Sequence, residues 1–354
     1  SKKALEIKLQ ALKGKLWVDC GFWGGVIPES LENNGTQLDE LLSAGVLGAK
    51  SFLIHSGVDE FPNVSGEDIK KALPIMAKHQ VPYLIHAELD KAHNEPQEIG
   101  DKYQSFLDSR PRSWENDAID LMVSLGEEAK AEGVDAHIHI VHLSSSDALE
   151  KITYAKNAGL KFTAETCPHY LTLFSEEIPD GKTLFKCCPP IREDENRQKL
   201  WQALKAGDID FIVSDHSPCT PELKKIDSGD LENAWGGISA LQFGLPLIWT
   251  EAKQRGFTLS DISHLMSTAT AQFVGLDDKK GKIAVGAYAD ILVFDDEKEV
   301  IISSEMIKHK HKITPYVGKK VTGEVNKTYL RGQLVYSEQD IMGQPQGNSL
   351  LFQS

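Results

Sequence analysis

Four side chains that can bind metal ions stand at or near the ends of four separate apolar runs of this sequence. They are Lys50, His86, His142 and Asp215. Taken singly, a histidine at a strand end is more often a hydrogen-bonded structural residue, and a buried aspartate is often simply paired. The carboxyl ends of parallel strands, however, meet at one rim, where barrel enzymes keep their metal ligands. The four residues together therefore favour a metal centre.

Lys50 is the least expected member of this set, because it lies in an apolar run. Burial disfavours a charged ammonium group, so such a lysine needs a partner or a changed chemical state. A neutral amine can take up carbon dioxide and become a carbamate, which is an anion able to bridge two metal ions. We therefore expect Lys50 to be either paired or carboxylated.

Six short apolar runs are predicted to be the strands that position these residues. They are Leu16–Gly21, Val46–Ile54, Val81–His86, Ala136–Leu143, Lys161–Thr166 and Phe211–Ser214. Segments with helical periodicity lie between them, and three pairs resemble helix-capping boxes: Thr36 with Asp39, Ser65 with Asp68, and Thr258 with Asp261. Alternation of strand and helix predicts parallel βα units.

The fold class predicted from these units is α/β, specifically a TIM-type (β/α)8 barrel. Six units are too few for a closed barrel, and the sequence starts without methionine in a helical pattern, so we expect that the first strands are missing. An open doubly wound sheet is the alternative, but no Gly-rich phosphate loop follows any strand. Residues 1–275 are assigned to the barrel, 276–336 to a small β module with turn glycines, and 337–354 to a polar, mobile tail.

The overall composition indicates a folded protein that acts on a small molecule. The 354 residues are 41% hydrophobic and 25% charged. A formal net charge of -14 opposes attraction to nucleic acid or an anionic membrane. An odd set of five cysteines indicates reduced thiols and a cytoplasmic protein, and no apolar run of about 18 residues is present to span a membrane.

Seven motifs, taken in order, resemble those of the allantoinases, in the dihydroorotase and hydantoinase branch of the amidohydrolases. The resemblance extends from about Leu9 to Tyr336. The motifs are Gly21-Phe22-Trp23-Gly24-Gly25, Lys50-Ser51-Phe52-Leu53, His86-Ala87-Glu88, His142-Leu143-Ser144, Glu165-Thr166-Cys167-Pro168-His169-Tyr170, Pro189-Pro190-Ile191-Arg192 and Ser214-Asp215-His216-Ser217-Pro218.

The resemblance implies hydrolysis of allantoin to allantoate by two zinc ions in a homo-oligomer, a tetramer in this family. It makes Lys50 the carboxylated bridging lysine, with carbon dioxide as the source of its carbamate. It makes His86 and His142 ligands of the second metal, and Asp215 a ligand of the first. Asp215 is also implied to be the general base and acid, which accepts a proton from the attacking hydroxide and passes it to the departing ring nitrogen.

The sequence departs from the family at the first metal, because no His-x-His pair precedes Lys50. The pair His137-Ile138-His139 lies in the strand that already supplies His142, and we interpret it as structural. The first metal therefore lacks two ligands, and we expect one weakly held metal and little or no turnover. The alternatives are a dihydropyrimidinase or hydantoinase, and a noncatalytic structural subunit.

Several further residues are predicted to lie around the substrate. Hydantoinases and dihydropyrimidinases place a tyrosine five residues after the bridging lysine, where this sequence has His55. His55 is either an oxyanion donor or a loop histidine without a contact. The resemblance also implies main-chain contacts to substrate at Cys188 and at Gly236 or Gly237. Cys167 is interpreted as a buried structural thiol because it has no assigned base, and His169 as a residue that orients a ligand or a loop.

Overall fold

The computed structural model describes residues 1–90 and 98–352, and its centre is a parallel sheet of six strands. The strands pair in chain order, without the reversal of order that defines a doubly wound sheet. The barrel-type fold is therefore confirmed. Within the described residues β1 and β6 do not pair with each other, so the sheet stays open. The strands are β1 Trp23–Gly25, β2 Gly48–Phe52, β3 Tyr83–His86, β4 Ile138–Ile140, β5 Phe162–Thr166 and β6 Phe211–Ile212.

Five of the six predicted strands are present, but the first prediction, Leu16–Gly21, is wrong. Its main chain pairs with the C-terminal segment, because the Cys20 N–H donates to the Asn348 carbonyl and the Cys20 carbonyl accepts from the Leu350 N–H. The first strand lies instead at Trp23–Gly25, against β2. Its glycines allow close packing, since a Cβ on Gly24 would stand 2.8 Å from the Leu41 side chain. Adjacent glycines are typical of a turn, but in this segment they are part of a strand that packs closely against its neighbours.

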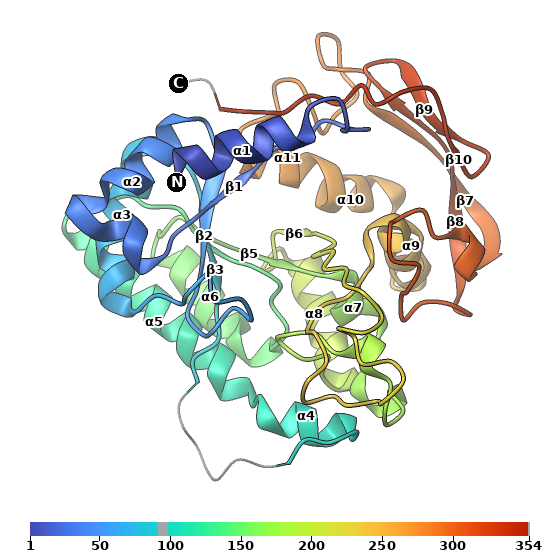
Figure 1. The fold of residues 1–354 in the computed structure, drawn as a ribbon, viewed down its shortest axis with the longest axis horizontal. Helices are drawn as coiled ribbons and strands as arrows, with labels where there is room; N and C mark the ends of the chain where they lie inside the picture. Colours follow the sequence, from blue (N-terminus) through green and yellow to red (C-terminus); the bar gives the residue numbers. More distant parts are fainter. Residues whose placement is uncertain (91–97, 353–354) are drawn as a thin grey trace.

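Helices cover the outer side of this sheet in chain order (Figure 1). Contacts join α2 to α3, α3 to α5 and α5 to α6, and the buried apolar residues fill the space between helices and strands. None of the described helices is long and apolar enough to cross a membrane. The helices are α1 Lys2–Leu12, α2 Glu32–Ser43, α3 Gly66–His79, α4 Tyr103–Ser109, α5 Arg112–Ala131, α6 Leu149–Asn157, α7 Pro168–Thr172, α8 Asp194–Ala206, α9 Gly244–Gln254, α10 Leu259–Ser263 and α11 Ala269–Phe273.

Two of the three predicted capping boxes are confirmed. Ser65 caps α3 with Asp68, and Thr258 caps α10 with Asp261. The prediction for Thr36 is wrong. Its hydroxyl donates to the Asn33 carbonyl at 2.7 Å, next to a left-handed break in α2 at residues 33–35, instead of pairing with Asp39.

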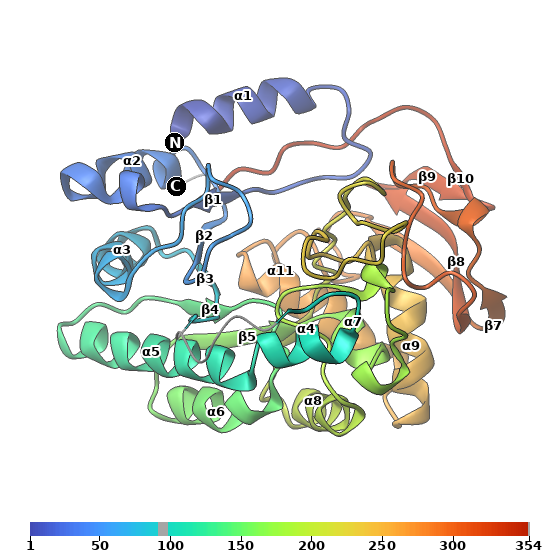
Figure 2. The same ribbon diagram turned by 60° about the horizontal axis from the view of Figure 1, so that its bottom comes forward.

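A small antiparallel sheet of four strands, ordered β10-β9-β8-β7, stands on the opposite side of the molecule from α2 and α3 (Figures 1 and 2). It confirms the predicted β module, whose bounds of 276–336 remain a prediction. The sheet extends into the predicted tail, and the tail is not free: Gly347 donates to Leu16, and Phe352 donates to Gly45. Residues 353–354 of the predicted tail lie outside the described residues. The strands are β7 Ile291–Ile301, β8 Lys320–Leu330, β9 Gln333–Ser337 and β10 Asp340–Ile341.

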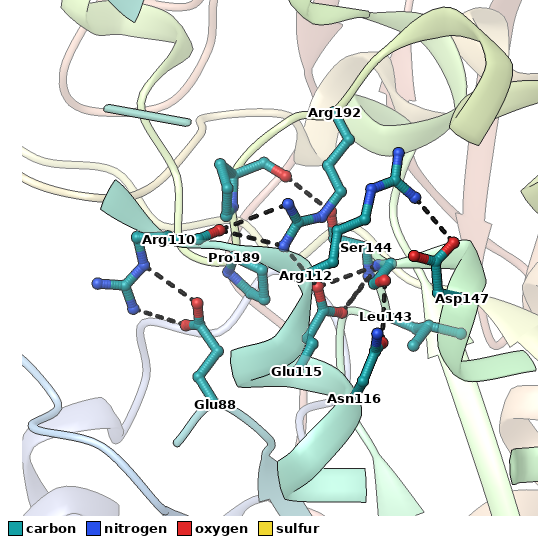
Figure 3. A network of polar contacts seen from close by, with 12 residues as sticks. Glu88, Arg110, Arg112, Glu115, Asn116, Leu143, Ser144, Asp147, Pro189 and Arg192 are labelled. Atoms are coloured by element: carbon teal, nitrogen blue, oxygen red, sulfur yellow. Dashed lines mark hydrogen bonds and ion pairs between the residues drawn. The ribbon is translucent and has the colours of Figure 1, made fainter. Parts of the chain in front are cut away.

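A buried ion pair holds the loops that follow β4 and α7. The Glu115 carboxylate, on α5, accepts hydrogen bonds from the main-chain N–H groups of Ser144 and Ser145 and from the Arg192 guanidinium (Figure 3). Glu115 is 2% exposed and Arg192 is 4% exposed. Because water cannot solvate either charge, each depends on the other and on the loop amides.

The histidine pair at the start of β4 is held by the neighbouring strand. His137 Nε2 and His139 Nδ1 each lie 2.8 Å from the hydroxyl oxygen of Thr163. The His139 ring also stacks on Phe211. Burial, with smaller contributions from His139 and Lys161, lowers the pKa of His137 to about 4. These contacts support the structural interpretation of the pair.

His137 should make the protein less stable as the pH falls from about 6.5 to about 4. The unfolded chain protonates this imidazole near pH 6.5, whereas the folded chain resists protonation until about pH 4. Across this window wild type should lose about 1 to 3 kcal/mol of unfolding free energy that His137→Gln does not lose. Urea unfolding of both proteins at several pH values measures the difference. Parallel pH profiles would contradict this assignment.

Glu115→Ala should lower the free energy of unfolding by about 3 to 5 kcal/mol, because it leaves the Arg192 charge buried without a partner. Glu128→Ala is the control, since Glu128 pairs with Lys70 on the surface. The control should change stability by less than about 1 kcal/mol. Equal effects of the two substitutions in urea unfolding would refute a structural role for the buried pair.

Candidate active site

The four predicted metal-binding residues lie at or near the carboxyl ends of β2, β3, β4 and β6. Lys50 is within β2 and His86 is the last residue of β3, while His142 and Asp215 follow β4 and β6. The ring centroids of His86 and His142 are 4.5 Å apart. The positive charge of Lys50 acts to lower the pKa values of His86, His142 and Asp215. The structure thus brings these residues from four strands together at one rim.

The backbone at two of these residues is left-handed, which is uncommon for a residue other than glycine. His142 and Asp215 each have a φ of 41°. This conformation costs about 1 to 2 kcal/mol in an ordinary residue, and such strain concentrates at functional sites. Both residues lie within three positions of a strand end, in the segment where the chain turns at the rim.

The electrostatics of the rim favour neutral imidazoles and a carboxylate that titrates near neutral pH. Burial raises the pKa of Asp215 to about 6, although Lys50 acts in the opposite direction. Burial, together with the charges of His86 and Lys50, holds the pKa of His142 well below its usual value. A neutral imidazole is the form that binds a metal. Moreover, the buried Nδ1 of His142 has no hydrogen-bond partner among the described residues. These donors fit a divalent metal.

Glu88 and Arg110 were missed in the sequence, and they hold His86 in place. Glu88 Oε2 lies 2.6 Å from His86 Nε2. Arg110 pairs with both Glu88 oxygens, at 3.0 and 2.6 Å, as Figure 3 shows. Burial alone raises the pKa of Glu88, but Arg110 and His86 bring it down to about 2. The contact occupies Nε2 of His86, so Nδ1 is the nitrogen left for a metal. The short spacing in His86-Ala87-Glu88 was the available sequence signal.

A cavity of about 290 Å³ opens beside His86 and contains most of the predicted substrate-side residues. His55, Cys188 and Gly236 line it, together with Arg110. The His55 side chain is 62% exposed and lies 3.6 Å from Asp59. It therefore has freedom to approach a bound molecule.

Gly237 does not line this cavity. Its N–H donates to the Lys186 carbonyl, and its own carbonyl accepts from the Lys224 ammonium. Both of its main-chain groups are thus engaged within the protein, which favours Gly236 over Gly237 as the contact.

A larger cavity of about 790 Å³ lies at the opposite ends of the strands. Its lining includes Leu47, Pro82, His137 and Lys161, each shortly before a strand begins. None of the predicted metal-binding residues reaches it. Because barrel enzymes carry their chemistry at the carboxyl ends of the strands, the smaller cavity is the candidate active site.

Two further residues stand beside Asp215 at the end of β5. Ligand atoms of Cys167, His169 and Asp215 all lie within 4.8 Å of one another. The sequence predicts a structural role for Cys167, which has no assigned base, and an orienting role for His169. Both reach Asp215 because β5 and β6 pair side by side. The structure places both residues next to a predicted metal ligand.

Comparison with known proteins agrees with this geometry. The model of the amidohydrolase family matches residues 2–335. An allantoinase of Saccharomyces cerevisiae is 46% identical over 98% of this chain and 74% of its own length. One of Arabidopsis thaliana is 44% identical over 96% of this chain and 68% of its own. The L-hydantoinase (dihydropyrimidinase) structure from Arthrobacter aurescens, at 25% identity, has a TM-score of 0.90 over 99% of this chain and 77% of that one. The chain therefore belongs to the amidohydrolase family, in which allantoinases are among its relatives.

Proposed function

We propose that this protein opens the hydantoin ring of allantoin by hydrolysis and releases allantoate. The observation that carries the proposal is the meeting of Lys50, His86, His142 and Asp215 beside a cavity lined by His55. Relatives named as allantoinases at 46% and 44% identity favour allantoin over other cyclic amides. The homo-tetramer and the cytoplasmic location expected from the sequence remain predictions.

Zinc is the metal that we propose for the site. His86 and His142, with a carboxylated Lys50, would hold one ion, and Asp215 would help to hold a second. Nitrogen and oxygen donors suit zinc, and the unpartnered Nδ1 of His142 is available to it. When bound, zinc supplies Lewis acidity, which acidifies water and polarises the ring carbonyl.

Lys50 is suited to carboxylation by its surroundings. Within the described part of the chain its ammonium has no hydrogen bond or ion pair, and it stands 4.9 Å from the Phe52 ring centroid. Its charge interacts with the Asp215 carboxylate and with the buried imidazoles of His86 and His142. In its neutral form this amine would react with carbon dioxide to give the carbamate.

Asp215 is the residue that we propose to move the proton. With a pKa of about 6, Asp215 is mostly ionised at neutral pH, and its protonated form is accessible. It accepts a proton from the attacking water and delivers it to the ring nitrogen as the carbon–nitrogen bond breaks. His55 donates a hydrogen bond to the developing oxyanion, and main-chain groups of Cys188 and Gly236 orient the ring amide.

The ranking of substrates tests the proposal. The zinc-loaded protein should show a kcat/KM on allantoin at least about tenfold above those on hydantoin and dihydrouracil, because a site built for one ring discriminates against others. Asp215→Asn is the control for contaminating activity. Dihydrouracil as the best substrate would overturn the allantoin assignment, and no turnover of any of the three would overturn the enzyme assignment for this chain.

Zinc uptake should depend on bicarbonate through Lys50. Metal-free protein reloaded with zinc should bind more metal with bicarbonate than in carbon dioxide-free buffer, and Lys50→Met should abolish the difference. Lys70→Met is the matched control, because Lys70 pairs with Glu128 at the surface. Equal zinc uptake in both buffers, measured by atomic absorption, would exclude the carbamate.

A further inference from the structure

The cluster of Cys167, His169 and Asp215 has the composition of a metal site that contains a thiolate. The three ligand atoms come within 4.8 Å of one another, while ligands of a tetrahedral zinc ion are separated by roughly 3.3 to 3.6 Å. A closure of about 1 Å would therefore complete the site. A thiolate, an imidazole and a carboxylate suit borderline-soft cations such as Zn²⁺ and disfavour Mg²⁺ and Ca²⁺.

His169 independently indicates a missing ligand. Its side chain is fully buried, yet neither ring nitrogen has a hydrogen-bond partner among the described residues. A buried imidazole without any partner loses its hydrogen bonds to water and gains none in return. The adjacent Tyr170 supplies a ring contact at 4.2 Å, and its hydroxyl donates to the Pro189 carbonyl. A metal ion bound by His169 would satisfy one of the two nitrogens.

Lys50 is the group that competes with a cation here. Its charge acts on both Cys167 and Asp215, so a protonated Lys50 partly neutralises the cluster. Carboxylation would replace this positive charge with a negative one and would favour a metal beside Asp215. The two chemical changes should therefore reinforce each other.

We propose that Cys167, His169 and Asp215 bind a zinc ion through a thiolate, an imidazole and a carboxylate. These side chains supply three of the four ligands that a tetrahedral zinc ion takes. This site goes beyond the proposed function, because it predicts a zinc–sulfur bond whichever cyclic amide is the substrate.

X-ray absorption at the zinc edge tests this coordination on the unmodified chain. Protein loaded with zinc in bicarbonate buffer should show a sulfur neighbour at about 2.3 Å in addition to nitrogen and oxygen neighbours. Nitrogen and oxygen neighbours alone would overturn the proposal. Because this measurement needs no substitution, it does not depend on the folding of a variant.

Cobalt substitution identifies which cysteine supplies the sulfur. Co²⁺ should produce a thiolate charge-transfer absorption that Cys167→Ser abolishes, and His169→Gln should weaken Co²⁺ binding at this site at least about a hundredfold. Cys187→Ser is the matched control, because Cys187 is also buried but donates to the Pro189 carbonyl. The control should keep the absorption. Its persistence in Cys167→Ser, or its loss in the control alone, would refute the site.

The allantoin assay separates this proposal from the proposed function. A zinc–sulfur signal without allantoin turnover would support the metal site and contradict the function. Turnover of allantoin without any zinc–sulfur signal would support the function and contradict the metal site.

Discussion

The parallel pairing of the strands is the constraint on which the rest of this structure depends. The six strands of the central sheet run in the same direction and pair in chain order, so their carboxyl ends all lie at the same rim. Residues as distant in sequence as Lys50 and Asp215 then become electrostatic partners. A change of order in the sheet would separate them without changing any residue.

The polar groups at this rim are held in position by a second layer of buried charges. Glu88 with Arg110 holds His86, and Glu115 with Arg192 holds the loop after His142. Arg192 also donates to the Arg110 carbonyl, which joins the two pairs (Figure 3). Such pairs add little net stability compared with apolar packing, but breaking one leaves a charge buried. We therefore interpret the network as a device that fixes geometry rather than one that stabilises the fold.

The alternation of apolar runs and helical segments was sufficient to predict the barrel-type fold and its six strands. The four rim residues could also be predicted, because a polar side chain near the end of an apolar run can be recognised in the sequence. The sequence was not sufficient for contacts that depend on neighbouring strands or loops. Arg110 reaches Glu88 from a different element, and Cys167 approaches Asp215 only because β5 and β6 pair. The first strand was misplaced for a similar reason, since the pairing of Cys20 with the C-terminal segment cannot be inferred from local pattern.

The central claim is that side chains from four strands surround a divalent metal at the carboxyl rim. Anomalous diffraction at the zinc edge, from crystals of the zinc-loaded protein, locates the metal directly. The account predicts an anomalous peak within bonding distance of His86 and His142, with Lys50 pointing toward it and extended by a carbamate. A peak at the opposite ends of the strands, or a Lys50 side chain directed into solvent, would contradict it.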